Sequence, residues 1–244
     1  MRIDTCIVIS FYDERPTEDL VRLLRRLRHD ASQSEFAVRV VVNSTRGDPL
    51  VLPPDLSATA VDIRENSGFN IGAWHHGWSR NPGFRFYIFL QDECEIVNPA
   101  WLSRYKTWLS NERIGLVGES LLSWSNWSEF KQKWPEATRE CTAIGRDNKI
   151  DLGRSPTHLQ TLALGASALC LEATNGFVIA DEKIKAIATE IMFSRHCLHR
   201  GFKIKQSAWR PFEYIKHPQW SALRDDSAKL MWNVSRALKQ LGNS

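Results

Sequence analysis

A cluster of oxygen-bearing side chains follows directly on an apolar, β-rich run at residues 85–90 (RFYIFL). The cluster consists of Gln91, Asp92, Glu93 and Glu95. Hard divalent cations prefer oxygen ligands and bind through a few carboxylates, with phosphate and water completing their shell. The cluster therefore indicates a cation or phosphate site, provided that the run before it is a strand ending at a ligand-binding edge. The alternative is a solvated acidic turn, because most Asp and Glu side chains lie at protein surfaces.

Several apolar, β-rich runs in the first hundred residues alternate with helical patterns and would position such a site. The first run, 6–11 (CIVISF), is continuous, which is typical of a strand buried on both faces of a mainly parallel sheet. Thr17 then precedes an amphipathic helix with acids in its first turn. Further strands are expected at 37–42, 58–66 and 85–90, with a glycine-bearing loop and helix at 68–78. This alternation predicts a doubly wound α/β sheet with ligands at the carboxyl ends of its strands.

The pattern is less regular after Pro99. We expect a helix at 101–111, a strand at 114–120 and a tryptophan-rich loop or irregular helix at 121–134. A core segment at 157–173 precedes a helix at 182–201 that is closed by Gly201. A last strand with a loop follows at 202–220, and then an amphipathic, basic helix at 224–241. No repeat or low-complexity linker divides the sequence. We therefore interpret residues 1–244 as a single domain with parts at 1–98, 99–220 and 221–244.

Composition and charge exclude several classes of protein. The 244 residues include 43% hydrophobic and 25% charged residues, which is typical of a soluble globular chain and not of a disordered or collagenous one. The net charge of +4 is too small to indicate nucleic-acid binding. It is also uneven: residues 200–244 hold nine Lys or Arg against three Asp or Glu, whereas residues 1–199 hold 23 against 25. The basic helix at 224–241 would therefore dock on an anionic membrane surface, or pack its apolar face on the domain.

Features of the sequence predict a cytoplasmic protein, which would lie at the inner face of the membrane if the basic helix at 224–241 docks there. Its five Cys are widely spaced and form no CxxC pair, which favours buried free thiols in a reducing compartment over a disulfide framework or a zinc site. Acidic residues appear early, so no signal-peptide segment fits the N-terminus. No apolar run approaches the roughly 20 residues of a membrane span.

Four motifs within residues 6–96 resemble those of family 2 glycosyltransferases of the GT-A fold, in the same order and at similar spacing. Residues 9–14 resemble the family's Ile-Pro-x-Tyr-Asn-Glu run, 40–48 its Val-Asp-Asn-Gly-Ser-x-Asp signature, 66–72 its Asn-x-Gly-x-x-x-Gly segment, and 90–93 its Leu-Asp-x-Asp segment. The resemblance implies a GT-A-like α/β domain, with a doubly wound, mixed but mainly parallel sheet flanked by helices. It implies a nucleotide-sugar site at Ser10, Phe11, Tyr12, Glu14, Asn43, Asn66, Gly68, Asn70, Gly72, Gln91 and Asp92.

The same resemblance implies a metal site, although this sequence departs from the family at that point. Gln91 replaces the first Asp of the family's Asp-x-Asp and Glu93 replaces the second. Glu93, Asp92 and His217 are the expected ligands for Mg²⁺ or Mn²⁺, and a weakened or metal-independent diphosphate site is the alternative. Gly68 and Gly72 are expected to be small so that the backbone can approach the donor closely.

The family's general base is an acid near the start of a helix in the second half of the chain. Glu190 is the best counterpart, with Asp181 and Glu182 as alternatives. The competing interpretation of Glu190 is a surface helical acid in a weak ion pair. His75 and His76 follow the glycine loop and are further candidates for the donor site.

These implications add up to an inverting, metal-assisted glycosyltransferase. Its donor would be a UDP, GDP or dTDP sugar, and its acceptor a glycan or lipid-linked glycan, in the synthesis of bacterial surface polysaccharide or O-antigen. Five of the ten tryptophans lie after residue 120 and before residue 221, where aromatic faces would line a saccharide groove or simply join the core: Trp124, Trp127, Trp134, Trp209 and Trp220. The alternative function is a catalytically inactive GT-A-like module for saccharide binding or assembly.

Overall fold

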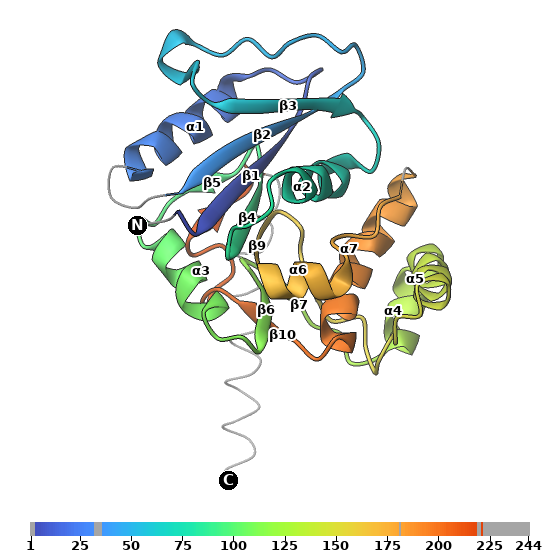
Figure 1. The fold of residues 1–244 in the computed structure, drawn as a ribbon. Coiled ribbons are helices and arrows are strands. Elements are labelled where there is room, and N and C mark those ends of the chain that lie inside the picture. Colours follow the sequence, from blue (N-terminus) through green and yellow to red (C-terminus); the bar gives the residue numbers. More distant parts are fainter. Residues whose placement is uncertain (1–2, 32–35, 181, 219–220, 222–244) are drawn as a thin grey trace.

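The computed structural model describes residues 3–31, 36–180, 182–218 and 221. Within this part, the main element is a seven-stranded sheet with the order β10-β6-β9-β4-β1-β2-β3 (Figure 1). Its strands are β1 (Thr5–Tyr12), β2 (Ala37–Ser44), β3 (Ala60–Glu65), β4 (Phe86–Gln91), β6 (Ile114–Gly118), β9 (Ala163–Ser167) and β10 (Lys203–Gln206). Two small antiparallel pairs lie beside it: β5 (Glu95–Ile96) with β11 (Ile215–Lys216), and β7 (Leu121–Leu122) with β8 (His158–Leu159).

The sheet is mixed but mainly parallel, as expected. β1 pairs in parallel with β2 and β4, and β2 pairs in parallel with β3, so the carboxyl ends of four strands meet at one edge. β9 runs antiparallel between β4 and β6, and β10 pairs in parallel with β6. The single α/β domain with helices flanking such a sheet is therefore confirmed.

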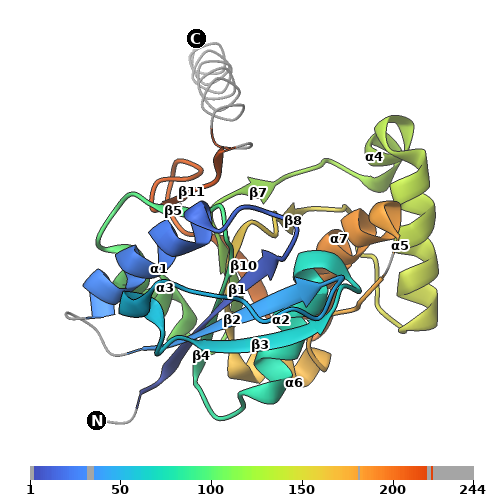
Figure 2. The same ribbon diagram turned by 90° about the horizontal axis from the view of Figure 1, so that it is seen from above.

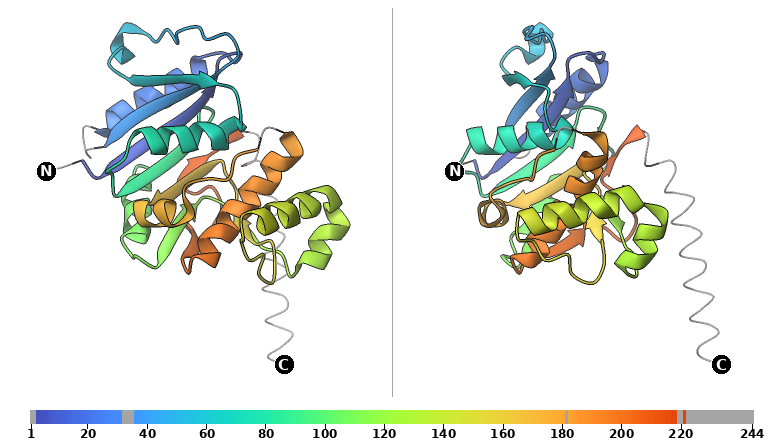
Figure 3. Two further views of the ribbon diagram at one scale, coloured as in Figure 1. Left: turned by 45° about the vertical axis from the view of Figure 1, so that its right-hand side comes forward. Right: turned by 90° about the vertical axis from the view of Figure 1, so that its right-hand side faces the viewer.

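Helices cover both faces of the sheet. They are α1 (Glu18–Ala31), α2 (Phe69–Arg80), α3 (Trp101–Leu109), α4 (Trp127–Lys133), α5 (Pro135–Asp147), α6 (Ala168–Thr174) and α7 (Lys183–His199), with a 3-10 turn, η1, at Pro54–Leu56. Leucines of α1 and aromatic residues of α3 form one buried cluster with the sheet, and residues of α2, α6 and α7 form another on the opposite face. Figure 3 shows this arrangement from two sides.

The central strand β1 illustrates why these residues form these elements. Its side chains are almost all buried, and successive residues alternate between the two helical layers. Ile7, Ile9 and Phe11 pack with α1, whereas Cys6 and Val8 pack with α2. α1 begins at Glu18, immediately after Thr17, and its four leucines are buried as expected.

Helices α4 and α5 form a separate unit that packs on α7 rather than on the sheet (Figure 2). The tryptophan-rich stretch contains β7, a loop and the short helix α4, close to the expected irregular structure. The sequence analysis did not predict α5. Its buried face consists of Ala137, Cys141 and Gly145, which are too small to give a clear apolar periodicity.

Expectations about the cysteines, Gly201 and the C-terminal helix can be compared with the structure. All five cysteines are buried and none is in a disulfide. Gly201 follows α7 with a φ of +87°, as expected of a residue that closes a helix. In the described part of the chain, no helix has both the length and the apolar character needed to cross a membrane. The expected basic helix at 224–241 and Trp220 lie outside the described residues.

Candidate functional site

A cavity of about 410 Å³ opens at the carboxyl end of β4 and extends between α2, α7 and the α4–α5 unit. Gln91 and His217 line one end of it, and Asn70 comes from the first turn of α2. Glu190 of α7 lines the same cavity. The structure therefore brings together in one cavity residues from four of the expected site segments.

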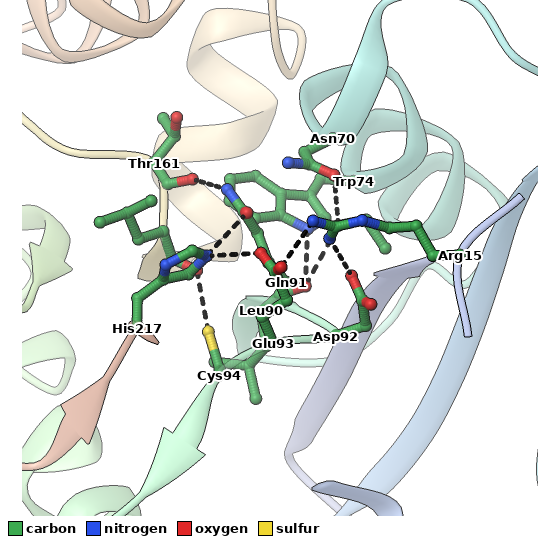
Figure 4. A network of polar contacts seen from close by, with 12 residues as sticks. Arg15, Asn70, Trp74, Leu90, Gln91, Asp92, Glu93, Cys94, Thr161 and His217 are labelled. Carbon is green, nitrogen blue, oxygen red and sulfur yellow. Dashed lines mark hydrogen bonds and ion pairs between the residues drawn. The ribbon is translucent and has the colours of Figure 1, made fainter. Parts of the chain in front are cut away.

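Polar contacts join the residues that follow β4 to His217 (Figure 4). His217 Nε2 lies 3.2 Å from Glu93 Oε2 and 3.2 Å from Gln91 Oε1. His217 reaches this position because β11 pairs with β5, directly after Glu93 in the chain. Burial lowers the pKa of the His217 imidazole, while the neighbouring Glu93 acts in the opposite direction. The buried ring is therefore held as a neutral group against two oxygen atoms.

Arg15, which no motif singled out, completes this group. Its guanidinium lies 2.5 Å from Glu93 Oε1 and 3.5 Å from Asp92 Oδ1 (Figure 4). Asp92 is only 4% exposed, and burial raises its pKa to about 6 although Arg15 opposes the shift. We call Arg15, Gln91, Asp92, Glu93 and His217 the strand-edge network. Its two carboxylates face one guanidinium, so with both ionised the network carries excess negative charge.

The expected metal ligands are gathered only in part. Within the described residues, no group of three His, Cys, Asp or Glu side chains is arranged to hold a metal ion. Asp92 is drawn toward Arg15, while Glu93 and His217 stand together with the amide oxygen of Gln91. The 3.2 Å separations are hydrogen-bond distances, and Gln91, Glu93 and His217 are the donors that lie close enough together to share a cation.

Glu190 is held at the opposite side of the network by Thr161. The Thr161 hydroxyl donates to Glu190 Oε2 at 2.7 Å, and the Thr161 carbonyl accepts from Gln91 Nε2 at 2.9 Å. The side chain of Glu190 is 25% exposed, and its Oε1 lies 3.9 Å from His158 Nε2, too far for a hydrogen bond. A continuous path of contacts thus connects Glu190 to the strand-edge network through Thr161 and Gln91.

The two alternative bases do not share this position. Glu182 is exposed and forms an ion pair of 2.6 Å with Lys185 on the surface. Asp181 lies outside the described residues. Glu190 is therefore the acid that the structure places in the cavity.

Most nucleotide-sugar candidates lie at the expected edge, but several are already engaged. The Ser10 hydroxyl donates to Asn70 Oδ1 at 2.9 Å. The amide of Asn43 donates to the Phe69 carbonyl at 2.9 Å and accepts from Arg64 at 2.6 Å. Each end of the Asn43 amide thus makes one hydrogen bond within the protein. An amide has two N–H donors and two acceptor positions, so these bonds do not by themselves prevent a contact with a base.

The remaining polar candidates lie at the rim. Glu14 accepts a hydrogen bond of 3.0 Å from the Thr45 hydroxyl and is exposed. Tyr12 is half-buried, and its hydrogen bond to Glu14 raises the pKa of its hydroxyl. The backbone N–H of Asn66 donates to the Ser44 carbonyl at 3.1 Å. These residues remain accessible to a nucleotide at the end of β1 and β2.

Phe11 corrects the sequence analysis. Its side chain is 1% exposed and belongs to the core beneath α1, so it does not face the candidate site. Ser10 and Phe11 are adjacent on a strand, and adjacent strand residues point to opposite faces of the sheet. Because Ser10 faces Asn70, Phe11 faces away.

Packing within the protein, rather than close approach of a donor, explains why positions 68 and 72 must be glycine. A Cβ on Gly68 would collide with Ile179, and a Cβ on Gly72 would collide with the Ser67 carbonyl. Gly68 also has a φ of +68°, in the left-handed region, where it precedes α2. The protein's own packing therefore requires both glycines, whether or not a donor approaches them.

His75 and His76 do not line the cavity. His75 Nδ1 accepts the backbone N–H of Phe177 at 3.2 Å, which ties α2 to the segment after α6. His75 is thus a packing residue in this structure.

Sequence reasoning missed several residues that shape the site. Glu119 is 1% exposed at the end of β6 and accepts hydrogen bonds from Tyr105, Ser207 and the Tyr214 N–H, which anchors the segment carrying His217. Arg15 directly follows the first motif, and that adjacency was the only signal for it. Contacts between distant parts of the chain, such as these, leave no local pattern.

Comparisons with known proteins give a match at the level of structure alone. No protein-family profile and no curated protein sequence matches the chain. A mannosyltransferase from Pyrobaculum calidifontis, solved with GDP-Man and Mn²⁺, superposes with a TM-score of 0.52 at 14% identity, over 84% of this chain and 55% of that one. A Drosophila β1,4-galactosyltransferase 7 mutant, solved with manganese, UDP-Gal and xylobiose, gives 0.50 at 9% identity, over 89% and 71%.

The chain has the GT-A fold. It spans little more than half the length of the mannosyltransferase, so the activity of that whole protein does not follow from the match. The GT-A sheet places the carboxyl ends of β1, β2 and β4 together, and the cavity lies at that edge. The topology and the cavity thus agree on where a ligand would bind.

Proposed function

We propose that this protein is a glycosyltransferase that moves a sugar from a nucleoside-diphosphate donor to an acceptor hydroxyl, with inversion at the anomeric carbon. One observation carries the proposal. A single cavity at the ligand-binding edge of a GT-A sheet is lined by Gln91 and His217 at one end and by the carboxylate of Glu190 at another part of its wall. An inverting transfer requires a base and a leaving-group site close together, and here the charged residues Arg15 and Glu93 line a second cavity, which is connected to His217 through Glu93.

Glu190 would act as the general base. Thr161 holds Oε2, which leaves Oε1 to take the proton of the acceptor hydroxyl. The acceptor oxygen then attacks the anomeric carbon while the bond from that carbon to the diphosphate breaks. The nucleoside diphosphate leaves with the electron pair of that bond.

The strand-edge network would hold the diphosphate. Arg15 lines a small cavity of about 240 Å³ together with the carboxylates of Glu18, Asp19, Asp92 and Glu93, so a diphosphate would bind there only with a cation that offsets the excess negative charge. Glu93, His217 and Gln91 would bind Mg²⁺ or Mn²⁺, which stabilises negative charge on a departing diphosphate when it is present. Both neighbouring proteins described above were solved with manganese and a nucleotide sugar, which supports this part of the proposal.

The biological setting follows only from the sequence motifs. We propose membership of the family 2 type, a UDP, GDP or dTDP sugar as donor, and a role in bacterial surface polysaccharide or O-antigen synthesis at the cytoplasmic side of the membrane. The acceptor would be a glycan or a lipid-linked glycan. The motifs at 9–14, 40–48, 66–72 and 90–93 support this assignment.

Release of nucleoside diphosphate from a panel of UDP, GDP and dTDP sugars tests the proposal. At least one donor should be turned over, and Glu190→Gln should lower turnover by about a hundredfold or more, as expected for loss of a general base. Glu182→Gln is the matched control, because Glu182 lies at the start of the same helix but outside the cavity, and it should retain full activity. Turnover of Glu190→Gln within a few-fold of the unmodified protein would reject the base.

A second candidate function is a GT-A module that binds a saccharide without turning over a donor. Two observations favour it: both oxygens of Glu93 are occupied by Arg15 and His217, and His217 Nδ1 is buried with no partner in the described residues. A histidine that ligates a metal usually donates its other N–H to an acceptor. The same donor panel distinguishes the two, since a binding module releases no nucleoside diphosphate.

A further inference from the structure

The walls of the cavity differ in chemistry. Polar groups gather at the strand edge and beside Glu190. The opposite side is formed by six apolar residues from β7, the α4–α5 unit and α7, which we call the apolar wall: Leu122, Trp124, Phe130, Trp134, Ile187 and Ile191. A ligand that fills the cavity must therefore present a polar side and an apolar side.

Packing fixes the inner part of the apolar wall. Trp124 and Phe130 meet edge to face with ring centroids 5.0 Å apart, and Phe130 is buried. Trp127 Nε1 donates to the Leu152 carbonyl at 3.1 Å, which holds this end of α4 on the segment after α5. The inner wall is thus preformed rather than created by a ligand.

The outer part of the wall is exposed. Trp134, at the junction of α4 and α5, is 45% exposed, and Ile187 on α7 is 41% exposed, while both line the cavity. Large exposed apolar side chains grouped around a cavity favour a ligand that covers them. Because the wall includes aliphatic side chains as well as rings, it suits an apolar group better than stacking on a sugar ring alone.

One polar group in the cavity lacks a partner. Gln160 is 9% exposed, and its Oε1 is buried without a hydrogen bond in the part of the chain that the structure describes. A buried amide oxygen without a donor is costly, so a hydroxyl or N–H group of a bound molecule would stabilise it. Gln160 precedes Thr161, which holds Glu190. The missing donor therefore belongs to the same end of the ligand as the hydroxyl that Glu190 would deprotonate.

We propose that the acceptor is a glycoside with an apolar aglycone. Its sugar hydroxyls face Glu190 and Gln160, and its aglycone packs against Trp134 and Ile187. The inference rests on the proposed function, because only that function makes the bound molecule an acceptor. It adds that the acceptor carries an apolar group, a point that the motifs leave open between a free glycan and a lipid-linked one. It distinguishes this chain from a transferase whose acceptor is a free, fully polar sugar.

Calorimetric titration with matched pairs of glycosides tests the inference without any donor. The probes are 4-nitrophenyl and methyl glycosides of glucose, galactose, mannose, N-acetylglucosamine and rhamnose, with 4-nitrophenol alone as a further probe. At least one aryl glycoside should bind about tenfold or more tightly than its methyl partner, because the aglycone removes apolar surface from water. Equal affinities within every pair, no binding by any probe, or equally tight binding of 4-nitrophenol would overturn the proposal.

Two pairs of variants locate the effect. Trp134→Ala should abolish the preference for the aryl glycoside, whereas Trp209→Ala should retain it, because Trp209 is 83% exposed and does not line the cavity. Ile187→Ser should weaken the preference, and Leu169→Ser, on the exposed side of α6, should leave it unchanged. All four residues are exposed, so the variants are expected to fold. A preference that survives both Trp134→Ala and Ile187→Ser would overturn the assignment to the apolar wall.

The donor panel keeps this inference separate from the proposed function. Turnover of a nucleotide sugar without any preference for aryl glycosides would support the glycosyltransferase function and reject the apolar aglycone on the acceptor. Binding of an aryl glycoside that depends on Trp134, without turnover of any donor, would support the apolar site and reject the enzymatic function.

Discussion

The two ends of the cavity are built on different principles. At the strand edge, charged and polar side chains hold one another: Glu93 lies between Arg15 and His217, and Gln91 bridges His217 to Thr161. At the apolar wall, packing of rings and aliphatic side chains fixes the positions, and Gln160, which lines the same cavity, has a side-chain oxygen without a partner in the described residues. One end is suited to a small charged group of fixed geometry, and the other to a larger group of variable shape.

This difference predicts how each end responds to mutation. A substitution in the strand-edge network leaves another buried charge or polar group without its partner, which is costly. A substitution at the exposed part of the wall removes only contact area. Effects on turnover should therefore be large at the edge, whereas effects at the wall should appear in acceptor affinity.

Glu93→Gln should produce the largest effect. The amide cannot pair with Arg15 as a charge and cannot present two acceptor oxygens, so both Arg15 and His217 lose part of their support. We expect nucleoside-diphosphate release to fall by about a hundredfold to a thousandfold, the range for loss of one preorganised electrostatic group.

Glu95→Gln is the control for this change, because Glu95 is exposed two residues further along the chain. Binding of the aryl glycoside to Glu93→Gln should stay within about twofold, since the apolar wall does not include this residue. If turnover and glycoside binding are lost together, the two ends of the cavity are not separable.

His196→Gln should change how the stability of the protein depends on pH. His196 is buried on α7, and burial lowers its pKa to about 4, with Arg200 and His199 adding to the shift. The unfolded chain takes up the proton near pH 6.5, before the folded one does. His196 therefore contributes stability above that pH, which is lost as the pH falls toward 4.

Between pH 7.5 and 5 this loss should amount to about 1–2 kcal/mol in the free energy of unfolding. Denaturant unfolding at the two pH values measures it. His196→Gln should show a shallower pH dependence than the unmodified protein. An unchanged slope in His196→Gln would mean that His196 is not the group that titrates.

The smallest predicted effect is the change in Mn²⁺ affinity on Arg15→Gln, which should be a gain rather than a loss. Removing a positive charge beside Glu93 should tighten binding of Mn²⁺ by about threefold to tenfold, because like charges repel at this distance even in a partly solvated site. Electron paramagnetic resonance of free Mn²⁺ measures the affinity directly. Arg25→Gln, at the ion pair with Asp55, is the control. Weaker Mn²⁺ binding by Arg15→Gln would show that Arg15 supports the cation site rather than competing with it.

Much of the fold was predictable because its signals are local. The continuous apolar runs of β1, β2 and β4 and the leucines of α1 identify the parallel half of the sheet without reference to other parts of the chain. The oxygen cluster after β4 was predictable in the same way, whereas Glu190 followed only from the resemblance to the family's motifs. α5 was missed because its buried face is made of small residues.

The parts of the site that escaped prediction depend on long-range contacts. Arg15 meets Glu93 across 78 positions of sequence, and His217 meets Gln91 across 126. The residues next to Arg15 in the sequence give no sign that Glu93 will contact it. The error at Phe11 is different, because the alternation of side chains along a strand would have shown that Ser10 and Phe11 cannot both face the ligand.

The position of β9 has a consequence for synthesis of the chain. β4 ends at Gln91, yet the strand that covers its open edge begins only at Ala163. At translation rates of about 5–20 residues per second, the ribosome needs roughly 4–14 s to supply it. During that interval the largely apolar β4 presents an unpaired edge on the nascent protein, which is a template for aggregation. Production of this protein should therefore be most vulnerable while the segment from α3 to β9 is still being made, and slower translation there would lengthen the exposure.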